Sequence, residues 1–546
     1  MTETPSPAAL PDLAADAAPE FVDVPTCTEW LAHVPLANVA AAQKELLAQI
    51  GEFNRFPTKA GNRFAVLEAL REAVNFVQIE QAKRFVNRAL PLAPAENAVL
   101  LATTTLWDQM RIGYQHCLEA ALAGDAEMRA QGAVVCQRVL AYAGLKMFHY
   151  CRAYRELPKE GWQALHRAYA AAETLNVVDE PVKDYLNRDV QDASARVAYL
   201  RATLMGLASP NELSQRQLTF VAYLLERWAE KVDIAREPGE RTEEPVLAVD
   251  LAGDGSPERV SDPADVHARD PRYLDTRRLA KSLRNRIGLL RKGESPARLA
   301  LGEDCVQPSC EQLLVFLYRQ WCQVRSRATE RRPLSDAVHA CNDMATIHYY
   351  VSGRVFKQPG EQRELTQKQQ EEIATFGRVS TREEDDQDDY RDAKGFVLEH
   401  WQLLDESSQG LRFLRRAGTP GKRYMHGQLV GVRPGDSKSF MLGQVRWLSE
   451  TANGDLRAGL RILPGLPAAI AVRASGLNAV NEKWIPALSV TAVAALGTPP
   501  ALVLPSGWFK PKRVIEVWVE SAVRVRLLEI LERGSDFERL SYEIVP

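Results

Sequence analysis

The feature that most constrains the fold is a change of hydrophobic period near residue 394. Before it, from about 28 to 232, apolar residues recur at spacings of three and four, as in AAQKELLAQIGEF and RFAVLEALREAVNFVQIEQAKRFVNRAL. Beyond it, short runs such as SFMLGQVRWL, DLRAGLRIL and PAAIAVRA are separated by Gly, Pro, Asp and Asn. The first pattern predicts amphipathic helices, and the second predicts short antiparallel strands. We therefore expect a helical domain joined to a β-barrel or sandwich.

A chain of 546 residues is too long for a single compact core. We predict a multi-domain α+β protein with an N-terminal all-α domain of helical hairpins or a bundle, an antiparallel β-barrel and a C-terminal β extension. Six segments are expected: a disordered tail, the helical domain, a linker or extended segment, a mixed helical region with one or two strands near 338–353, the barrel, and a final β-unit (1–25, 26–232, 233–275, 276–375, 376–480 and 481–546).

One segment of the helical domain, GWQALHRAYAAAETL, is similar to a tetratricopeptide hairpin. Trp162, Leu165 and Tyr169 have the spacing of that repeat, but His166 stands where glycine is usual. No second copy follows at a fixed period. The alternative is a single helix whose tryptophan and tyrosine face the core, and this is the interpretation we favour.

Charge, cysteine content and hydropathy exclude several classes of protein. The formal net charge is −3 and the pI is about 6.4, so no overall field attracts nucleic acid or an anionic membrane. The basic run RRLAKSLRNRIGLLRK is expected to be a solvated helix face. Eight scattered cysteines without a CxxC pair indicate free buried thiols in a reducing compartment. The stretch 486–505 predicts two short strands and no membrane span, and we expect a cytoplasmic protein.

A loop and a turn carry the candidate binding chemistry. Arg378 and Arg382 follow the end of a predicted helix, with three residues between them. Asp405, Ser407 and Gly410 come next, in the hexapeptide DESSQG after a predicted strand. Guanidinium groups bind phosphate bidentately and stack on purine faces. An aspartate and a serine at a strand end meet base donors and acceptors, and a glycine allows a positive φ or close approach of a ligand.

This combination resembles the PilZ family, in which an RxxxR loop precedes a β-barrel and a D/N-x-S-x-x-G turn follows a strand. GQVRWL and LRAGLRIL are similar to paired central strands of that barrel. The resemblance covers roughly 90 residues, about 376–465. It implies a bacterial receptor for cyclic di-GMP, with Arg378, Arg382, Asp405, Ser407 and Gly410 as ligand-binding residues. It also implies an effect on motility, pili, exopolysaccharide or biofilm.

Two features modify this resemblance. RxxxR also occurs at Arg327/Arg331, Arg412/Arg416 and Arg457/Arg461, where structural arginines explain it. The first of these pairs precedes strand-like residues, so 276–375 is a candidate for a degenerate PilZ-like unit. The acidic run EEDDQDDYRD at 383–392 opposes phosphate binding unless it points outward, and it is a candidate lid that holds the arginines until ligand competes.

No enzyme motif accompanies the candidate site. A Walker loop, a Rossmann glycine fingerprint and a nucleophile elbow are all missing from the sequence. His116, His149 and His348 are expected in core or strand positions. We therefore predict a non-enzymatic receptor that uses no cofactor or metal and relays its ligand to an unidentified protein partner through the helical domain. The alternatives are a scaffold whose barrel no longer binds nucleotide and a phosphodiesterase of the same ligand.

Overall fold

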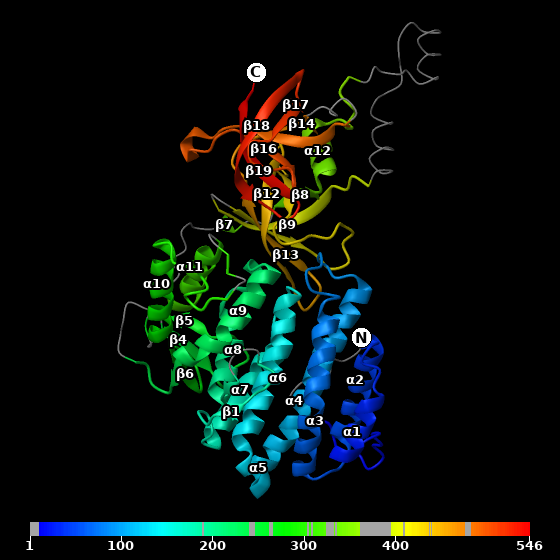
Figure 1. The fold of residues 1–546 in the computed structure, drawn as a ribbon, viewed down its shortest axis with the longest axis vertical. Helices are drawn as coiled ribbons and strands as arrows, with labels where there is room; N and C mark the ends of the chain where they lie inside the picture. The colour runs from blue at the N-terminus through cyan, green and yellow to red at the C-terminus, as the bar shows by residue number, and fades with distance from the viewer. Residues whose placement is uncertain are drawn as a thin grey trace. The chain divides into compact units, whose positions relative to one another are not determined.

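The computed structural model groups the chain into two units. The first contains residues 1–88 and 92–327, and the second contains residues 89–91 and 328–546. The structure describes residues 10–545 with these exceptions: 188–190, 240–245, 261, 263–265, 303–304, 307–308, 324–331, 334–335, 361–394, 408–409, 436, 438 and 476–481. Figure 1 shows the helices and strands, with labels where there is room.

Among its described residues, the first unit begins with nine α-helices. They are α1 (Val24–His33), α2 (Val39–Arg55), α3 (Ala60–Ala82), α4 (Pro94–Ala123), α5 (Ala126–Ala130), α6 (Gly132–Arg152), α7 (Lys159–Thr174), α8 (Ala195–Leu207) and α9 (Gln215–Trp228). Side chains cap the N-termini of several of these helices. At α1 the Asp23 carboxylate accepts a hydrogen bond from the Thr26 amide at 3.0 Å, and at α9 Ser214 and Gln217 form a capping box. The predicted helical domain is confirmed, and the two-residue strands β1 (Val182–Lys183) and β2 (Asp192–Ala193) pair within it.

The N-terminal tail is ordered further back than the sequence indicated. Phe21 is completely buried, and its ring lies 4.9 Å from that of Trp30 and 5.3 Å from that of Phe53. The alanine- and proline-rich composition suggested disorder up to residue 25. That prediction is wrong for the last part of the tail, because one aromatic side chain anchors it in the helical core.

The segment expected as a linker holds a small sheet. Its strands are β3 (Asp233–Ala235), β4 (Val246–Asp250), β5 (Glu258–Val260) and β6 (Pro271–Asp275), in the order β3-β6-β4-β5. Leu247, Ala248 and Val249 of β4 are buried. Arg272 of β6 binds Glu173 of α7 at 2.5 Å, which fixes the sheet to the helices. The helices α10 (Arg277–Arg291) and α11 (Ser309–Cys322) follow, as predicted.

The second unit contains a closed six-stranded barrel. Its strands are β8 (Ala337–Asn342), β9 (Glu399–Ser407), β10 (Gly410–Arg415), β11 (Leu429–Pro434), β12 (Met441–Glu450) and β13 (Leu456–Ile462). The order is β10-β13-β12-β11-β8-β9, and β10 also pairs with β9, which closes the ring. The short strand β7 (Arg332–Pro333) adds to the free edge of β9. The helix α12 (Met344–Ser352) follows β8.

A second closed barrel follows directly. Its strands are β14 (Pro467–Ala474), β15 (Ile485–Val490), β16 (Ala501–Pro505), β17 (Val514–Trp518), β18 (Ala522–Arg533) and β19 (Phe537–Ile544), in the order β14-β15-β16-β19-β18-β17. Leu442 and Leu463, on and just after strands of the first barrel, share a buried cluster with Leu488, Val503 and Phe537 of the second. The predicted α+β fold class, with a barrel and a C-terminal β-unit packed on it, is confirmed.

Two local predictions are wrong. The stretch around His348 was expected to be a strand, but it forms α12, because Asp343 caps the helix by accepting from the Thr346 amide at 2.9 Å. Cys305 and Cys310 are joined by a disulfide, whereas free thiols were expected throughout. The other six cysteines are free and buried as predicted.

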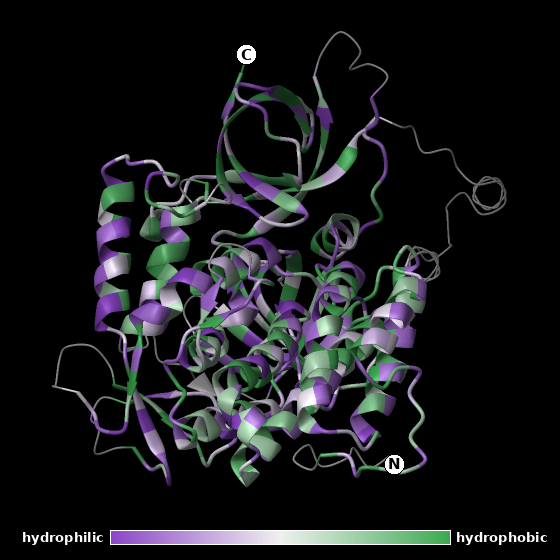
Figure 2. Cartoon of the chain, turned by 60° about the horizontal axis from the view of Figure 1, so that its bottom comes forward, coloured by the Kyte–Doolittle hydropathy of each residue, from purple (hydrophilic) through white to green (hydrophobic). Residues whose placement is uncertain are grey.

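The helices carry hydrophilic and hydrophobic bands side by side (Figure 2). Among the described residues, no helix is both long enough and apolar enough to cross a membrane. The stretch 486–505 forms β15 and β16, as its proline and glycine content indicated.

Candidate PilZ ligand site

The DESSQG turn is the tip of a hairpin between β9 and β10. Ser407 pairs directly with Gly410, and the Ser407 hydroxyl donates to the Gly410 carbonyl at 3.2 Å. The two residues between them, 408 and 409, lie outside the described residues. A two-residue connection fixes the register of the two strands tightly. The sequence prediction of a turn after a strand is confirmed, and three of the five candidate residues lie together on this hairpin.

Asp405 lies next to the turn, with its side chain buried. Its carboxylate binds the Arg412 guanidinium at 2.6 Å across the strand pair, and the two side chains are 7% and 44% exposed. The register shifts between Arg412 and Phe413, so Arg412 faces Asp405 while Phe413 faces Leu403. A bulge of this kind re-aims side chains, and here it places a buried acid and an exposed arginine together at one end of the barrel.

Gly410 is needed for close packing between strands. A Cβ atom at this position would lie 2.6 Å from the Leu460 carbonyl oxygen of β13. Gly410 is not among the described glycines with positive φ. The sequence predicted either a positive φ or close approach of a ligand at this glycine. The structure shows a close approach, but the group that approaches Gly410 is the backbone of β13.

A buried polar network supports the hairpin from inside the barrel. The Arg415 guanidinium donates to Glu399 at 2.7 Å and to the Lys422 carbonyl at 2.8 Å. It also lies 5.1 Å from the centre of the Trp401 ring, and the Trp401 indole donates to Glu399 at 3.0 Å. Burial and the nearby Glu399 carboxylate raise the pKa of Tyr424 well above its usual value. The site is thus built on a rigid strand pair.

The predicted arginines Arg378 and Arg382 lie outside the described residues, as do the helix expected before them and the acidic run 383–392. The pair Arg327 and Arg331 also lies outside them. However, the chain immediately after Arg331 is β7, whose residues Arg332 and Pro333 pair with Glu406 and Asp405.

The sequence alone did not indicate that the chain just after Arg331 pairs with the strand that leads into the DESSQG turn. The 276–375 segment was a candidate for a degenerate PilZ-like unit, and a structural or non-binding role was favoured for Arg327 and Arg331 because no D-x-S-x-x-G turn follows them. The structure differs, because β8 pairs with β9 in the same barrel that carries the turn. The available signal was the arginine-rich run RATERRP directly before strand-like residues. The long insertion between β8 and β9 hid it.

Two arginines of the other RxxxR pairs form ion pairs that fit the structural role expected for them. Arg416 binds Asp455 at 3.0 Å, and Arg461 forms an ion pair with Glu532 of β18. Where the chain is described, no group of three or more His, Cys, Asp or Glu side chains could hold a metal ion. His149 lies in the helical core as predicted, and burial lowers its pKa to about 4.

Comparison with known proteins places these features in a family. Three family models match successive parts of the chain: "Cyclic-di-GMP receptor FimW, N-terminal domain" at residues 25–239, "Cyclic-di-GMP receptor FimW, middle PilZ domain" at 246–397, and "FimW C-terminal beta-barrel domain" at 470–545. The cyclic-di-GMP receptor FimW of Pseudomonas aeruginosa is 23% identical over 512 residues, which cover 87% of this chain and 83% of the relative.

The matched ranges bear on the site in two ways. The middle match contains both arginine pairs, and it ends at residue 397, before the DESSQG turn. The C-terminal match covers the second barrel. The matched proteins are described as receptors, so the prediction that the chain is not an enzyme is confirmed.

Proposed function

Because the chain is a PilZ-domain protein with the three-part domain organisation of the FimW receptors, we propose that it is a non-enzymatic receptor for cyclic di-GMP. The observation that carries this proposal is the similarity to a cyclic-di-GMP receptor over 87% of the chain. The hairpin with the DESSQG turn, built at one end of a closed barrel, supports it independently.

The hairpin supplies one wall of the proposed site. Asp405 and Ser407 offer oxygen atoms that accept from guanine N–H groups, and the hydroxyl of Ser407 also donates. In the structure the Asp405 carboxylate is bound to Arg412. The exposed Arg412 guanidinium can turn to a phosphate while Asp405 turns to a base, so the ion pair holds both groups in place before ligand arrives.

Two arginine pairs are candidates for the opposite wall. Arg378 and Arg382 are the pair predicted from the sequence. The position of β7 favours Arg327 and Arg331 instead, because consecutive Cα atoms are only about 3.8 Å apart and Arg331 adjoins a strand paired with Asp405 and Glu406. We therefore propose Arg327 and Arg331 as the main phosphate ligands and retain the predicted pair as the alternative.

The relay forms the second part of the proposal. Ligand would act through the 377–393 segment, and the helical domain would present or hide a surface for a protein partner in the cytoplasm. The size of the helical domain supports separate roles for ligand binding and partner binding, since the nine helices described in it lie outside the barrel unit. The alternative is a scaffold whose barrel binds no nucleotide.

Calorimetric titration of the full chain with cyclic di-GMP tests the proposal. Wild type should bind saturably. The double variant Arg327→Ala/Arg331→Ala should weaken binding at least tenfold, since each lost charged hydrogen bond costs about 1.5–3 kcal/mol. The variant Arg416→Ala, at an exposed arginine of another RxxxR pair, is the matched control and should bind like wild type.

The outcomes separate the alternatives. If only Arg378→Ala/Arg382→Ala weakens binding, the predicted pair is the correct one. If wild type gives neither heat nor a thermal shift, the receptor proposal fails and the scaffold remains. Loss of intact ligand during long incubation would indicate a phosphodiesterase. Neutralising the acidic run should tighten binding if it acts as a lid, and unchanged affinity at low salt would dismiss that role.

A further inference from the structure

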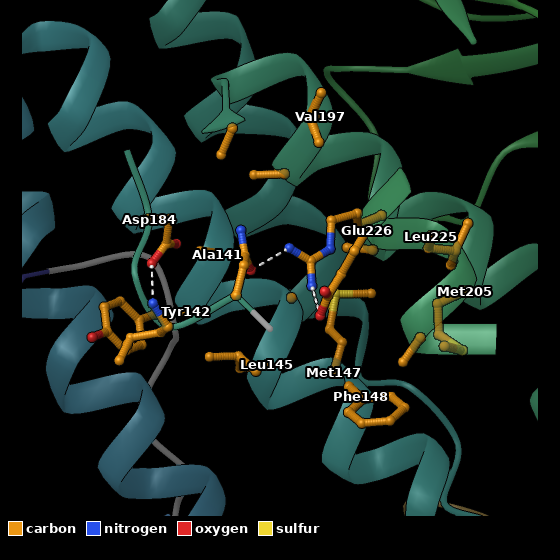
Figure 3. Close-up of a pocket in the computed structure, with 18 of the residues that line it drawn as sticks. Ala141, Tyr142, Leu145, Met147, Phe148, Asp184, Val197, Met205, Leu225 and Glu226 are labelled. Carbon is orange, nitrogen blue, oxygen red and sulfur yellow. Dashed lines mark hydrogen bonds and ion pairs between the residues drawn. The ribbon is translucent and has the colours of Figure 1, made fainter. Parts of the chain in front are cut away.

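A cavity of about 220 Å³ lies inside the helical domain, among α6, α8, α9 and the segment that carries β1 and β2 (Figure 3). All its lining residues belong to the first unit. An engineered apolar cavity of about 150 Å³ admits benzene. In proportion, this one takes about nine non-hydrogen atoms, the size of an aromatic ring with a short substituent.

Small side chains create the cavity. A Cβ atom added at Gly144 of α6 would lie 3.3 Å from the Cβ of Ala202 of α8, so the two helices are already in close contact there. Beside this contact, Ala141, Ala198 and Ala222 line the cavity and leave its volume unfilled. Protein interiors are normally packed without voids of this size, so a built cavity needs an explanation.

One side of the cavity is apolar. Leu145, Met147 and Phe148 come from α6, Met205 from α8 and Leu225 from α9, and Figure 3 labels these lining side chains. Methionine and phenylalanine adapt well to flat apolar ligands. This side therefore suits a ring or a branched hydrocarbon.

The other side is polar, and the pair formed there by Arg201 and Glu226 is only partly engaged. The Arg201 guanidinium donates to Asn187 at 2.8 Å, but it lies 3.5 Å from Glu226, longer than a good charged hydrogen bond. Arg71 binds Asp184 at 2.5 Å. Arg201 is 29% exposed although it lines the cavity, so its guanidinium remains accessible to a ligand atom.

The charges at this polar end cancel. Arg71, Arg201 and, beneath them, Arg138 supply three cations, and Asp184, Glu226 and Glu68 supply three anions. Arg138 binds Glu68 at 2.9 Å, and Glu68 also contacts Arg71 at 3.5 Å, so the network extends beyond the lining residues. A charged ligand would upset this balance in a place shielded from water. A neutral acceptor and donor would fit both Arg201 and Glu226.

We propose that this cavity is a second binding site, for a neutral ligand with an apolar ring or branched body and one amide or hydroxyl group. The body would occupy the Leu145–Phe148 side, and the polar group would accept from Arg201 and donate to Glu226. The same chemistry is offered by a free small molecule and by an apolar side chain with its adjoining peptide group. The site is built from other residues than the proposed cyclic di-GMP site, because all its lining residues lie outside the barrel unit.

Three probes with one body and different heads test the ligand class. Thermal unfolding of the full chain and calorimetry would be measured with 2-phenylacetamide, phenylacetate and phenethylamine at millimolar concentration. The amide should bind roughly tenfold or more tightly than either charged analogue. Equal binding of all three probes, or no binding of any, would overturn the proposal.

Matched variants connect binding to the cavity. Ala141→Phe fills the space and should abolish binding of the amide while the protein unfolds at no lower temperature. Arg201→Gln leaves Glu226 in excess and should shift the preference to phenethylamine, and Glu226→Gln should shift it to phenylacetate. Arg167→Gln, at an exposed arginine of α7, is the control and should change nothing. Unaltered preferences in both charge variants would refute the assignment.

The source of the ligand can be distinguished in the same assay. N-acetylphenylalaninamide carries the phenyl ring next to peptide groups, as a partner protein would present it, and it is larger than the cavity. Tighter binding of this compound than of 2-phenylacetamide indicates a side chain from a partner whose remaining peptide groups lie outside the cavity. Weaker binding indicates that the cavity admits only a body of the size of a free small molecule. Both results support the site, whereas failure of both compounds contradicts it without affecting the proposed function of the barrel.

Discussion

Replacement of Gly410 by alanine tests whether the candidate hairpin depends on close strand packing. The added Cβ would lie 2.6 Å from the Leu460 carbonyl oxygen, so β10 must move away from β13. Overpacking of this kind destabilises the folded state by about 1–3 kcal/mol. Replacing glycine also restricts the unfolded chain, which stabilises the protein by about 0.4–1 kcal/mol. The net destabilisation should be about 1–2 kcal/mol.

Gly443 of β12 offers a matched control in the same barrel. A Cβ there would lie 3.5 Å from the Arg461 carbonyl oxygen, an ordinary contact, so Gly443→Ala should stabilise slightly. Scanning calorimetry of both full-length variants should place the barrel transition of Gly410→Ala roughly 4–8 °C below that of Gly443→Ala, for a difference near 2 kcal/mol. Cyclic di-GMP affinity should fall only in the first. Equal transition temperatures would refute the packing argument.

Three further predictions concern buried side chains. Burial lowers the pKa of His149 to about 4, so the unfolded chain binds a proton that the folded chain does not as pH falls from about 6.5 to 4. The free energy of unfolding of the helical unit should decrease through that window by up to about 3 kcal/mol. In His149→Phe the urea midpoint should depend less steeply on pH, and the slope that remains should come from His116. Identical slopes in the variant and in wild type would contradict this. Arg415→Met leaves Glu399 buried without its ion partner and should lower the free energy of unfolding in urea by about 3–5 kcal/mol. Adding Glu399→Gln to this variant should restore part of that loss. Unchanged stability of Arg415→Met would disprove the coupling. Phe21→Ala should destabilise the helical unit by about 3–5 kcal/mol, and an unchanged midpoint would show that the tail is not anchored.

The sequence predicted features that depend on neighbours along the chain. Helical periodicity located the N-terminal domain, and the DESSQG hexapeptide located the hairpin, because a two-residue turn and its flanking strands are local. The burial of Trp162 and Tyr169 in α7 also followed from helical spacing. These features needed no knowledge of distant contacts.

Features made by distant contacts were not predictable. The pairing of β7 with β9 joins Arg332 to Glu406 across a long insertion, so the barrel seemed to begin much later in the chain than it does. The stretch around His348, with the sequence IHYY, resembles a strand in composition, but the Asp343 cap makes it helical. The cavity among α6, α8 and α9 depends on how helices pack, and no sequence motif marks it.

Amide hydrogen exchange with and without saturating cyclic di-GMP tests the central claim most directly. If the barrel binds the ligand beside the DESSQG turn, peptides that cover 399–415 and 325–342 should be protected. Peptides of the second barrel, such as 514–533, should change little and serve as an internal reference. No protection at any position, or protection confined to the helical domain, would contradict the account.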